Sequence, residues 1–145
     1  ARMLAEELVP RLRERYHLVP EASATALLGT RYFGLSSLYT ALEHPEVFGK
    51  VALQSPNLGL GAADAVRERI RARRGQGLDI YLDWDRYGER NLDRGIDTTA
   101  EARELAALLD AHGYHRSGGE VLDSAGWSGW RNRTDRLLAH LFPGD

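Results

Sequence analysis

The spacing of hydrophobic residues changes several times along the chain and divides it into short helices and strands. Leu4, Leu8, Leu12 and Tyr16 recur at four-residue spacing among charged residues. This spacing predicts an amphipathic first helix, because residues four apart lie on one face. Pro10 is expected either to bend this helix or to mark its first turn.

The rest of the chain alternates between strand-like and helix-like segments. We expect strands at residues 24–29, 50–54, 78–83 and 120–122, and helices at residues 35–43, 62–74, 99–112 and 130–141. The polar segment 84–98 is long enough to predict a functional or lid-like loop. Strands and helices that alternate at this spacing predict the α/β class, with a three-layer parallel sheet covered by helices on both faces.

Composition limits the kinds of protein that the chain can be. Its 145 residues, 43% of them hydrophobic, suit a single domain at 1–145 with a buried core. The lack of cysteine excludes disulfides, thiolate metal sites and cysteine nucleophiles. A net charge of −2 gives no electrostatic reason to expect a nucleic-acid partner.

No apolar run approaches the roughly 18 residues of a membrane span, and the first residues form an amphipathic pattern rather than a signal peptide. We therefore expect a soluble chain with no membrane partner. The cytoplasm is favoured, although the absence of cysteine leaves the redox compartment open.

One short segment is strongly basic. Its arginines lie at Arg67, Arg69, Arg71, Arg73 and Arg74. They could contact phosphate or a membrane, but we favour the solvated face and carboxyl end of a helix, where cations complement the helix dipole.

Two separated motifs carry a family resemblance. Residues 27–39 are Leu-Leu-Gly-Thr-Arg-Tyr-Phe-Gly-Leu-Ser-Ser-Leu-Tyr, and residues 127–131 are Trp-Ser-Gly-Trp-Arg. With the segments 41–49 and 53–55 between them, these motifs resemble the putative-esterase family of α/β-hydrolases. That family includes enterochelin esterases, esterase D and feruloyl esterases. The resemblance covers essentially the whole chain and implies the carboxyl-terminal half of an α/β-hydrolase fold.

In that family, Gly-x-Ser-x-Gly forms the nucleophile elbow, a strained strand-to-helix turn that exposes the serine hydroxyl. Here the serine position holds Arg31 and the second glycine position holds Phe33. Arginine stays protonated and cannot attack an acyl carbon. Phe33 is expected to relax the turn or to fill the former substrate pocket, because the glycine position leaves little room for a side chain.

The resemblance also implies where the other two members of the triad would lie. Aligning the terminal Trp-Arg motif with the family places Ala125 at the histidine position, which removes the general base. The acid position falls on Asp97 or Asp85, with Asp97 preferred. We therefore expect no intact catalytic residue. We also expect no metal or other cofactor, because no cluster has metal-ligand spacing.

Other serines and histidines offer poor replacements. Ser36 and Ser37 lie within a predicted helix, and Ser55 follows the second strand at the catalytic edge of the sheet. His112 and His115 lie at the end of a helix, where histidine commonly caps or complements the dipole. Neither histidine has the spacing to replace the base.

Arg31 is also a candidate binding residue. With the N–H groups at the start of a helix, its guanidinium could hold a carboxylate or phosphate. The competing interpretation, which we favour, is that Arg31 closes the dead site by pairing with one of four carboxylates: Asp85, Asp97, Asp123 or Glu89. The aromatic residues expected beside it in a ligand groove are Tyr32, Phe33, Trp84 and Trp127. Trp127 and Trp130 also suit packing of the closing helix on the sheet.

The resemblance implies that strand 24–29 is internal in an intact enzyme, beside a strand that comes earlier in the chain. The earlier segment also supplies half of the oxyanion hole. An apolar strand left at an edge offers unpaired backbone groups to another chain. We therefore expect this edge to bind either a second copy, as a homodimer, or a sheet-completing amino-terminal chain.

These inferences favour an esterase-like α/β-hydrolase module that is catalytically inactive and acts in assembly or ligand binding. The alternative is an active carboxylic-ester hydrolase, a serine esterase completed by another chain or by the missing amino-terminal half. The replacements at Arg31, Phe33 and Ala125 could be natural or engineered. Function must be inferred from the site, because one fold serves many reactions.

Overall fold

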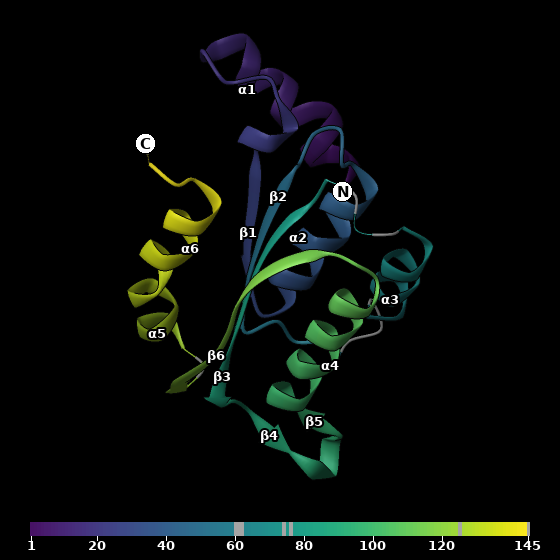
Figure 1. Cartoon of the computed structure of the whole chain (residues 1–145), viewed down its shortest axis with the longest axis vertical. Helices are drawn as coiled ribbons and strands as arrows, with labels where there is room; N and C mark the ends of the chain where they lie inside the picture. Colours follow the sequence, from purple (N-terminus) through teal and green to yellow (C-terminus); the bar gives the residue numbers. More distant parts are fainter. Residues whose placement is uncertain (60–62, 74, 76, 125, 145) are drawn as a thin grey trace.

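The computed structural model describes residues 1–59, 63–73, 75, 77–124 and 126–144. Its centre is a four-stranded sheet in which every strand is parallel to its neighbours (Figure 1). The strands are β1 (Ala26–Thr30), β2 (Lys50–Gln54), β3 (Asp79–Tyr87) and β6 (His115–Ser124), in the order β1-β2-β3-β6. The parallel sheet confirms the α/β class predicted from the alternating pattern.

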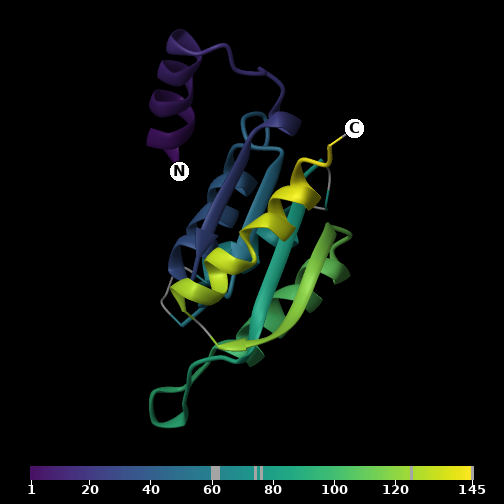
Figure 2. The same cartoon turned by 90° about the vertical axis from the view of Figure 1, so that its left-hand side faces the viewer.

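Helices cover both faces of this sheet (Figures 1 and 2). One face carries α2 (Tyr32–Glu43), α3 (Ala63–Ala72) and α4 (Thr98–Ala111), and the other carries α5 (Trp127–Asn132) and α6 (Thr134–Leu141). At the amino terminus, a π-helical segment, η1 (Met3–Leu8), continues into α1 (Val9–Arg15). Pro10 lies in the first turn of α1, one of the two positions expected for it. No described helix combines the length and apolar character that a membrane crossing requires.

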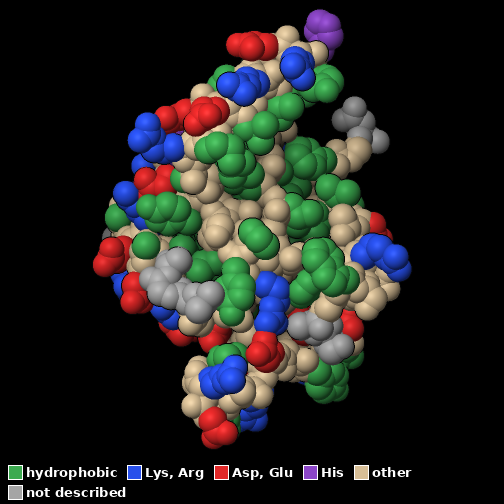
Figure 3. Space-filling model, turned by 180° about the vertical axis from the view of Figure 1, so that it is seen from behind, with side chains coloured by type: hydrophobic (Ala, Val, Ile, Leu, Met, Phe, Trp, Pro, Cys, Tyr) green, Lys and Arg blue, Asp and Glu red, His purple; other side chains and the backbone are tan. Residues whose placement is uncertain are grey.

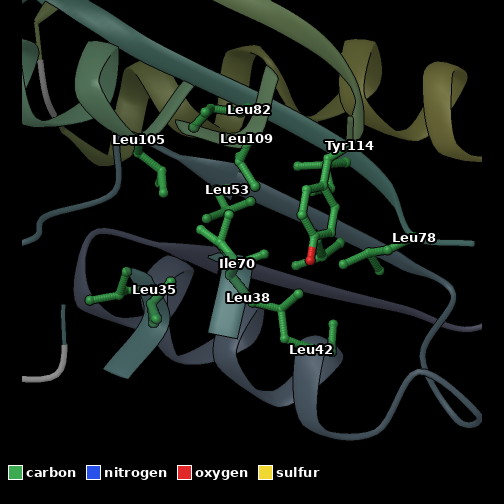
Figure 4. Close-up of a cluster of buried hydrophobic side chains, with 14 of the residues drawn as sticks. Leu35, Leu38, Leu42, Leu53, Ile70, Leu78, Leu82, Leu105, Leu109 and Tyr114 are labelled. Carbon is green, nitrogen blue, oxygen red and sulfur yellow. The ribbon is translucent and has the colours of Figure 1, made fainter. Parts of the chain in front are cut away.

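The larger part of the core lies between the sheet and α2, α3 and α4 (Figure 4). Leu53 of β2 and Leu82 of β3 point to this side, where they meet Leu38 and Ile70 from the helices. Successive residues of a strand point to opposite faces. Their neighbours therefore meet α6 on the other side, in a smaller cluster made of Ala52, Tyr81, Leu137 and Leu141.

The strand pairing brings the carboxyl ends of the strands to one edge of the sheet. Thr30 pairs with Gln54, and Gln54 pairs with Asp83. The residues that follow each strand, including Arg31 and Ser55, therefore gather at this edge. It carries the candidate site.

Two strands are longer than their hydrophobic pattern predicted. The prediction of a strand at 120–122 was too short, because β6 runs for ten residues. Its first half is polar and contains two glycines, so it shows no alternating pattern. The pairing with β3 makes it a strand, and Gly118 allows close contact there because a Cβ on it would overlap the Leu82 carbonyl group. The same pairing extends β3 to Tyr87.

The predicted loop 84–98 is therefore strand at its beginning. Its remainder is an arm that contains β4 (Arg90–Asn91), a 3-10 turn at Leu92–Arg94 and β5 (Ile96–Asp97). β4 and β5 pair antiparallel and project beyond the edge of the sheet (Figure 2). The last predicted helix, 130–141, is two helices that meet at Arg133.

Gly29 sets how closely α2 can follow β1. A Cβ on this residue would lie 2.5 Å from the Gly34 nitrogen and closer still to the Phe33 carbonyl group. We predict that Gly29→Ala lowers the free energy of unfolding by about 3 kcal/mol, because backbone atoms cannot move aside as a flexible side chain can. Urea unfolding of the variant measures the effect. Gly126→Ala is the control, because nothing lies within 4 Å of its added methyl group. Equal stability of the two variants would contradict this account.

Candidate functional site

Arg31 occupies the apex of a sharp turn between β1 and α2. Its backbone has φ 55° and ψ −125°, a region that residues with a Cβ rarely adopt. The turn is held by two hydrogen bonds: Arg31 N donates to Gln54 O at 3.1 Å, and Gly34 N donates to Arg31 O at 3.1 Å. This is the strained strand-turn-helix geometry of a nucleophile elbow, with arginine at the apex.

Phe33 does not have the effect expected from the sequence. The turn is not relaxed, and the Phe33 side chain is 76% exposed rather than packed into a pocket. The close approach falls on Gly29 and Gly34 instead, and a Cβ on Gly34 would lie 3.0 Å from the Gly29 oxygen. The glycine that the turn requires is therefore Gly34, one position after Phe33.

The Arg31 side chain reaches the arm that follows β3. Its Nη2 donates to Glu89 Oε2 and forms an ion pair with it. The backbone of Glu89 is itself held in place, because its carbonyl oxygen accepts hydrogen bonds from Thr98 N at 3.1 Å and from Thr98 Oγ1 at 3.3 Å. Among the four carboxylates proposed as partners for Arg31, the structure pairs it with Glu89.

The two candidate acids have other roles. Asp97 caps the amino end of α4 by accepting from Ala100 N at 2.9 Å. Asp85 is buried, accepts from the Ser55 hydroxyl, and lies 3.1 Å from Arg133 Nη2. Both carboxylates therefore have local partners that stabilise the fold.

Arg133, which the sequence analysis overlooked, is the centre of a buried charged cluster. Its Nε lies 3.2 Å from Asp83 Oδ2, its Nη2 contacts Asp85, and its Nη1 lies 3.0 Å from Asp123 Oδ2. It joins α5 to α6 and fastens both to β3 and β6. A signal was present in the sequence: Asp83 and Asp85 alternate along a buried strand, so both carboxylates face one side and require a cation there.

This cluster shifts the protonation of its members. Burial raises the pKa of Asp83, although the hydrogen bonds and charge of Arg133 act in the opposite direction. Burial, together with the negative charge of Asp83, raises the pKa of Tyr81 to about 12. The Tyr81 hydroxyl donates to Asp83 Oδ2 at 3.3 Å, so a phenolate there would lie against a carboxylate.

Ser55 lies at the right edge of the sheet but is held in a structural role. It is buried, with φ 48°, and its hydroxyl donates to Asp85 while accepting from Trp130 Nε1 at 3.0 Å. Ser36 is occupied by the α2 backbone, since its hydroxyl donates to Tyr32 O at 3.1 Å. A nucleophilic serine needs a neighbouring base and access to substrate. Neither residue has a histidine among its hydrogen-bond partners.

The histidines considered as replacements lie elsewhere. His112 caps α4 with Nδ1 2.9 Å from the Leu108 oxygen. His115 and His140 both contact Asp79, at 3.1 and 3.3 Å, and Asp79 is the first residue of β3, at the opposite end of that strand from the candidate site. Ala125, the expected occupant of the histidine position, lies outside the described residues. No three described His, Asp or Glu side chains are grouped so that they could hold a metal ion.

A groove of about 460 Å³ lies between the end of β1 and α5. Its lining is mainly apolar and includes Leu28, Thr30, Gln54, Trp127, Trp130 and Thr134. Trp127 is 80% exposed and meets Trp130 edge to face, whereas Trp130 is buried and packs α5 on the sheet. Trp84, expected in a ligand groove, is part of the core beneath α4. It points to the other face because it alternates with Asp83 and Asp85.

Two arginines of the basic segment on α3 are ion-paired within the chain, Arg71 and Arg73 are exposed, and Arg74 lies outside the described residues. Arg67 pairs with Asp64 and Glu104 at 3.1 Å, and Arg69 pairs with Glu43. This agrees with the solvated helix face favoured from the sequence.

A parallel sheet whose first strand enters a nucleophile elbow defines the α/β-hydrolase class. Within that class, the chain belongs to the family described as putative esterase, which matches residues 1–141. The Bacillus subtilis protein YjcH is 30% identical over 115 residues, which cover 75% of this chain and 45% of YjcH.

Solved esterase structures share the fold. The enterobactin esterase from Shigella flexneri superposes with a TM-score of 0.77 at 25% identity, over 94% of this chain and 35% of that protein. A ferulic acid esterase superposes with a TM-score of 0.74 at 12% identity, over 97% of this chain and 59% of its own. The chain therefore spans about half or less of the length of YjcH and the enterobactin esterase, and somewhat more than half of the ferulic acid esterase.

Removing the cation of the buried cluster tests its structural role. We expect Arg133→Met to lower the free energy of unfolding by about 3–5 kcal/mol, because it leaves buried carboxylates without their cation. The loss should be largest at neutral pH and smaller in mild acid, where those carboxyls can protonate. Chemical unfolding at several pH values measures it, and Arg131→Met, at an exposed position of α5, is the control. A pH-independent loss would contradict an electrostatic cause.

Tyr81 should ionise later than an ordinary tyrosine. Unfolded phenols lose their proton near pH 10, whereas folded Tyr81 keeps it to about 12, so the folded state binds more protons between these values. Stability is therefore lost as the pH rises through this window. Burial also raises the pKa of Tyr114, so the late phase of tyrosinate absorbance should include both residues among the six tyrosines. Tyr81→Phe should remove one equivalent from that phase, and Asp83→Asn should move that equivalent to lower pH. A late phase of unchanged amplitude in Tyr81→Phe would refute the assignment.

Proposed function

We propose that this chain is a catalytically silent module of the esterase fold, which acts in assembly or ligand binding. The observation that carries the proposal is the position of Arg31 at the apex of the elbow, with its side chain ion-paired to Glu89. The charge that occupies the nucleophile position is thereby neutralised within the chain.

Ester hydrolysis by this family's route needs an attacking hydroxyl and a base that accepts its proton. The guanidinium of Arg31 carries only donors and stays protonated, so it supplies neither. Ala125, at the position that the terminal motif gives to histidine, has no proton acceptor in its side chain. Ser55 and Ser36 are already hydrogen-bonded in structural roles.

The surface beside the site suits binding better than chemistry. β1 is an outer strand of the sheet, and the groove between β1 and α5 has an apolar lining. A second copy or a sheet-completing amino-terminal chain could occupy this side. The incomplete coverage of the solved esterases is consistent with either occupant, because those proteins contain more polypeptide than this chain.

The alternative is an active serine esterase completed by another chain or by an amino-terminal half. Family membership and the retained backbone of the elbow favour it. This alternative requires the completing polypeptide to supply both nucleophile and base. The Arg31–Glu89 pair argues against it, because that pair already occupies the apex of the turn.

A short-chain ester separates the two proposals. We expect the purified chain to hydrolyse p-nitrophenyl acetate no faster than buffer does. Three variants, Ser36→Ala, Ser37→Ala and Ser55→Ala, should leave that background unchanged. Ser128→Ala, at an exposed position of α5, is the control and should do the same. Turnover that disappears in one of the first three variants, but not in Ser128→Ala, would overturn the silent-module proposal.

A further inference from the structure

We propose that Glu89 is an internal substitute for the carboxylate of a small ligand, and that this ligand binds Arg31 at the elbow by displacing Glu89. This inference rests on the proposed function, since it names the class of ligand that the module binds. It is supported by the incomplete hydrogen bonding of the Arg31–Glu89 pair, by the fixed backbones on both sides of the pair and by the partial exposure of its two side chains.

The Arg31–Glu89 pair uses one donor and one acceptor. Arg31 Nη2 donates to Glu89 Oε2, and neither side chain has another hydrogen-bond partner among the described residues. A guanidinium carries five N–H donors and a carboxylate has two oxygens, so the pair leaves most of this capacity unused. No Arg31 nitrogen is among the described atoms that are buried without a partner, so the unused donors reach solvent.

Another ion pair in the chain shows the complete geometry. Arg116 Nε donates to Asp110 Oδ1 at 2.9 Å, and Arg116 Nη2 donates to Asp110 Oδ2 at 2.7 Å. Two parallel bonds of this kind form when a guanidinium and a carboxylate can align with each other. A ligand carboxylate that aligns with Arg31 would therefore gain one charge-assisted hydrogen bond that Glu89 does not provide.

The backbones on both sides of the pair are fixed, which limits how well Glu89 can align. The Glu89 carbonyl oxygen is held by Thr98, and a Cβ on the preceding Gly88 would lie 2.5 Å from the Thr98 hydroxyl and 2.6 Å from the Thr99 hydroxyl. Arg31 is held at the apex by its two backbone hydrogen bonds. The two side chains therefore meet only at their ends, whereas a free ligand has no such restriction.

The pair is weak enough to be exchanged for a ligand. The Arg31 side chain is 23% exposed and that of Glu89 is 45% exposed. An ion pair between partly exposed groups favours its own formation by about fivefold or less. Glu89 can therefore turn into water when another carboxylate binds Arg31. The small exposed area of the guanidinium suits a small molecule.

The surroundings of Arg31 favour a ligand with an apolar body. Thr30, the residue before Arg31, lines the mainly apolar groove that also contains Trp127. Seen from behind, hydrophobic side chains cover the middle of the molecule and most charged side chains lie towards its rim (Figure 3). A carboxylate attached to a small apolar group, such as benzoate, therefore suits the site better than inorganic phosphate.

Binding of benzoate to the wild-type chain tests the proposal without any substitution. Sodium benzoate is titrated at constant ionic strength, because salt screens exposed charges. The backbone amide signals of Arg31 and Tyr32 are followed by two-dimensional NMR. We expect these signals to shift and to saturate. Benzamide, which has a similar shape but no charge, should leave them in place, and inorganic phosphate should bind more weakly than benzoate.

Two substitutions test the role of the ion pair. Glu89→Gln should tighten benzoate binding by about fivefold, because it removes the internal competitor. Arg31→Gln should abolish the shift of the Tyr32 signal. Asp110→Asn is the matched control, because it frees Arg116 from its carboxylate at the opposite end of the sheet. It should leave the affinity measured at Tyr32 unchanged.

Unchanged affinity in Glu89→Gln would overturn the proposal, as would equal shifts with benzamide, equal binding of phosphate or equal tightening in Asp110→Asn. A chain that binds benzoate as expected but hydrolyses p-nitrophenyl acetate would refute the silent module and leave the carboxylate site intact. Conversely, an inactive chain that binds no benzoate would refute only this site and would leave assembly as the role of the module.

Discussion

The close approach of α2 to β1 determines the geometry of the whole candidate site. Gly29 and Gly34 face each other across the turn, with no room for a side chain on Gly29. Arg31 is the single residue between β1 and α2, so the chain must change direction at this residue. Arg31 adopts a positive φ there. Whatever side chain stands at this position is lifted above the carboxyl edge of the sheet, because the backbone leaves it no other direction.

This constraint separates the fold from the chemistry. Packing of glycine against backbone maintains the elbow and does not depend on a serine hydroxyl at the apex. With Arg31 at the apex the turn is present all the same, at a backbone strain of about 1–3 kcal/mol. The ion pair with Glu89 then connects the elbow to the arm formed by β4 and β5, a connection that a serine side chain is too short to make.

The hydrophobic pattern predicted the strands that are buried on both faces and the helices whose apolar residues recur at regular spacing. Residues 50–54 are an example, because β2 is covered on both faces and its central residues 51–53 are apolar. Only residues 120–122 of β6 were predicted, because the strand lies at an edge, where pairing with β3 rather than burial makes its first half a strand. Arg133 was missed for a related reason: an arginine near the carboxyl end of a chain looks like surface, and only the placement of Asp83 and Asp85 on one face shows why it is buried.

The Arg133 cluster also explains why the two sides of the sheet differ. Arg133 fixes the junction of α5 and α6 to the end of β3, so the two short helices cross the sheet towards β1 instead of lying over β6. Trp127 of α5 and Thr134 of α6 then lie in one groove with Leu28 of β1. The same buried cluster that stabilises the fold thus positions the groove beside β1.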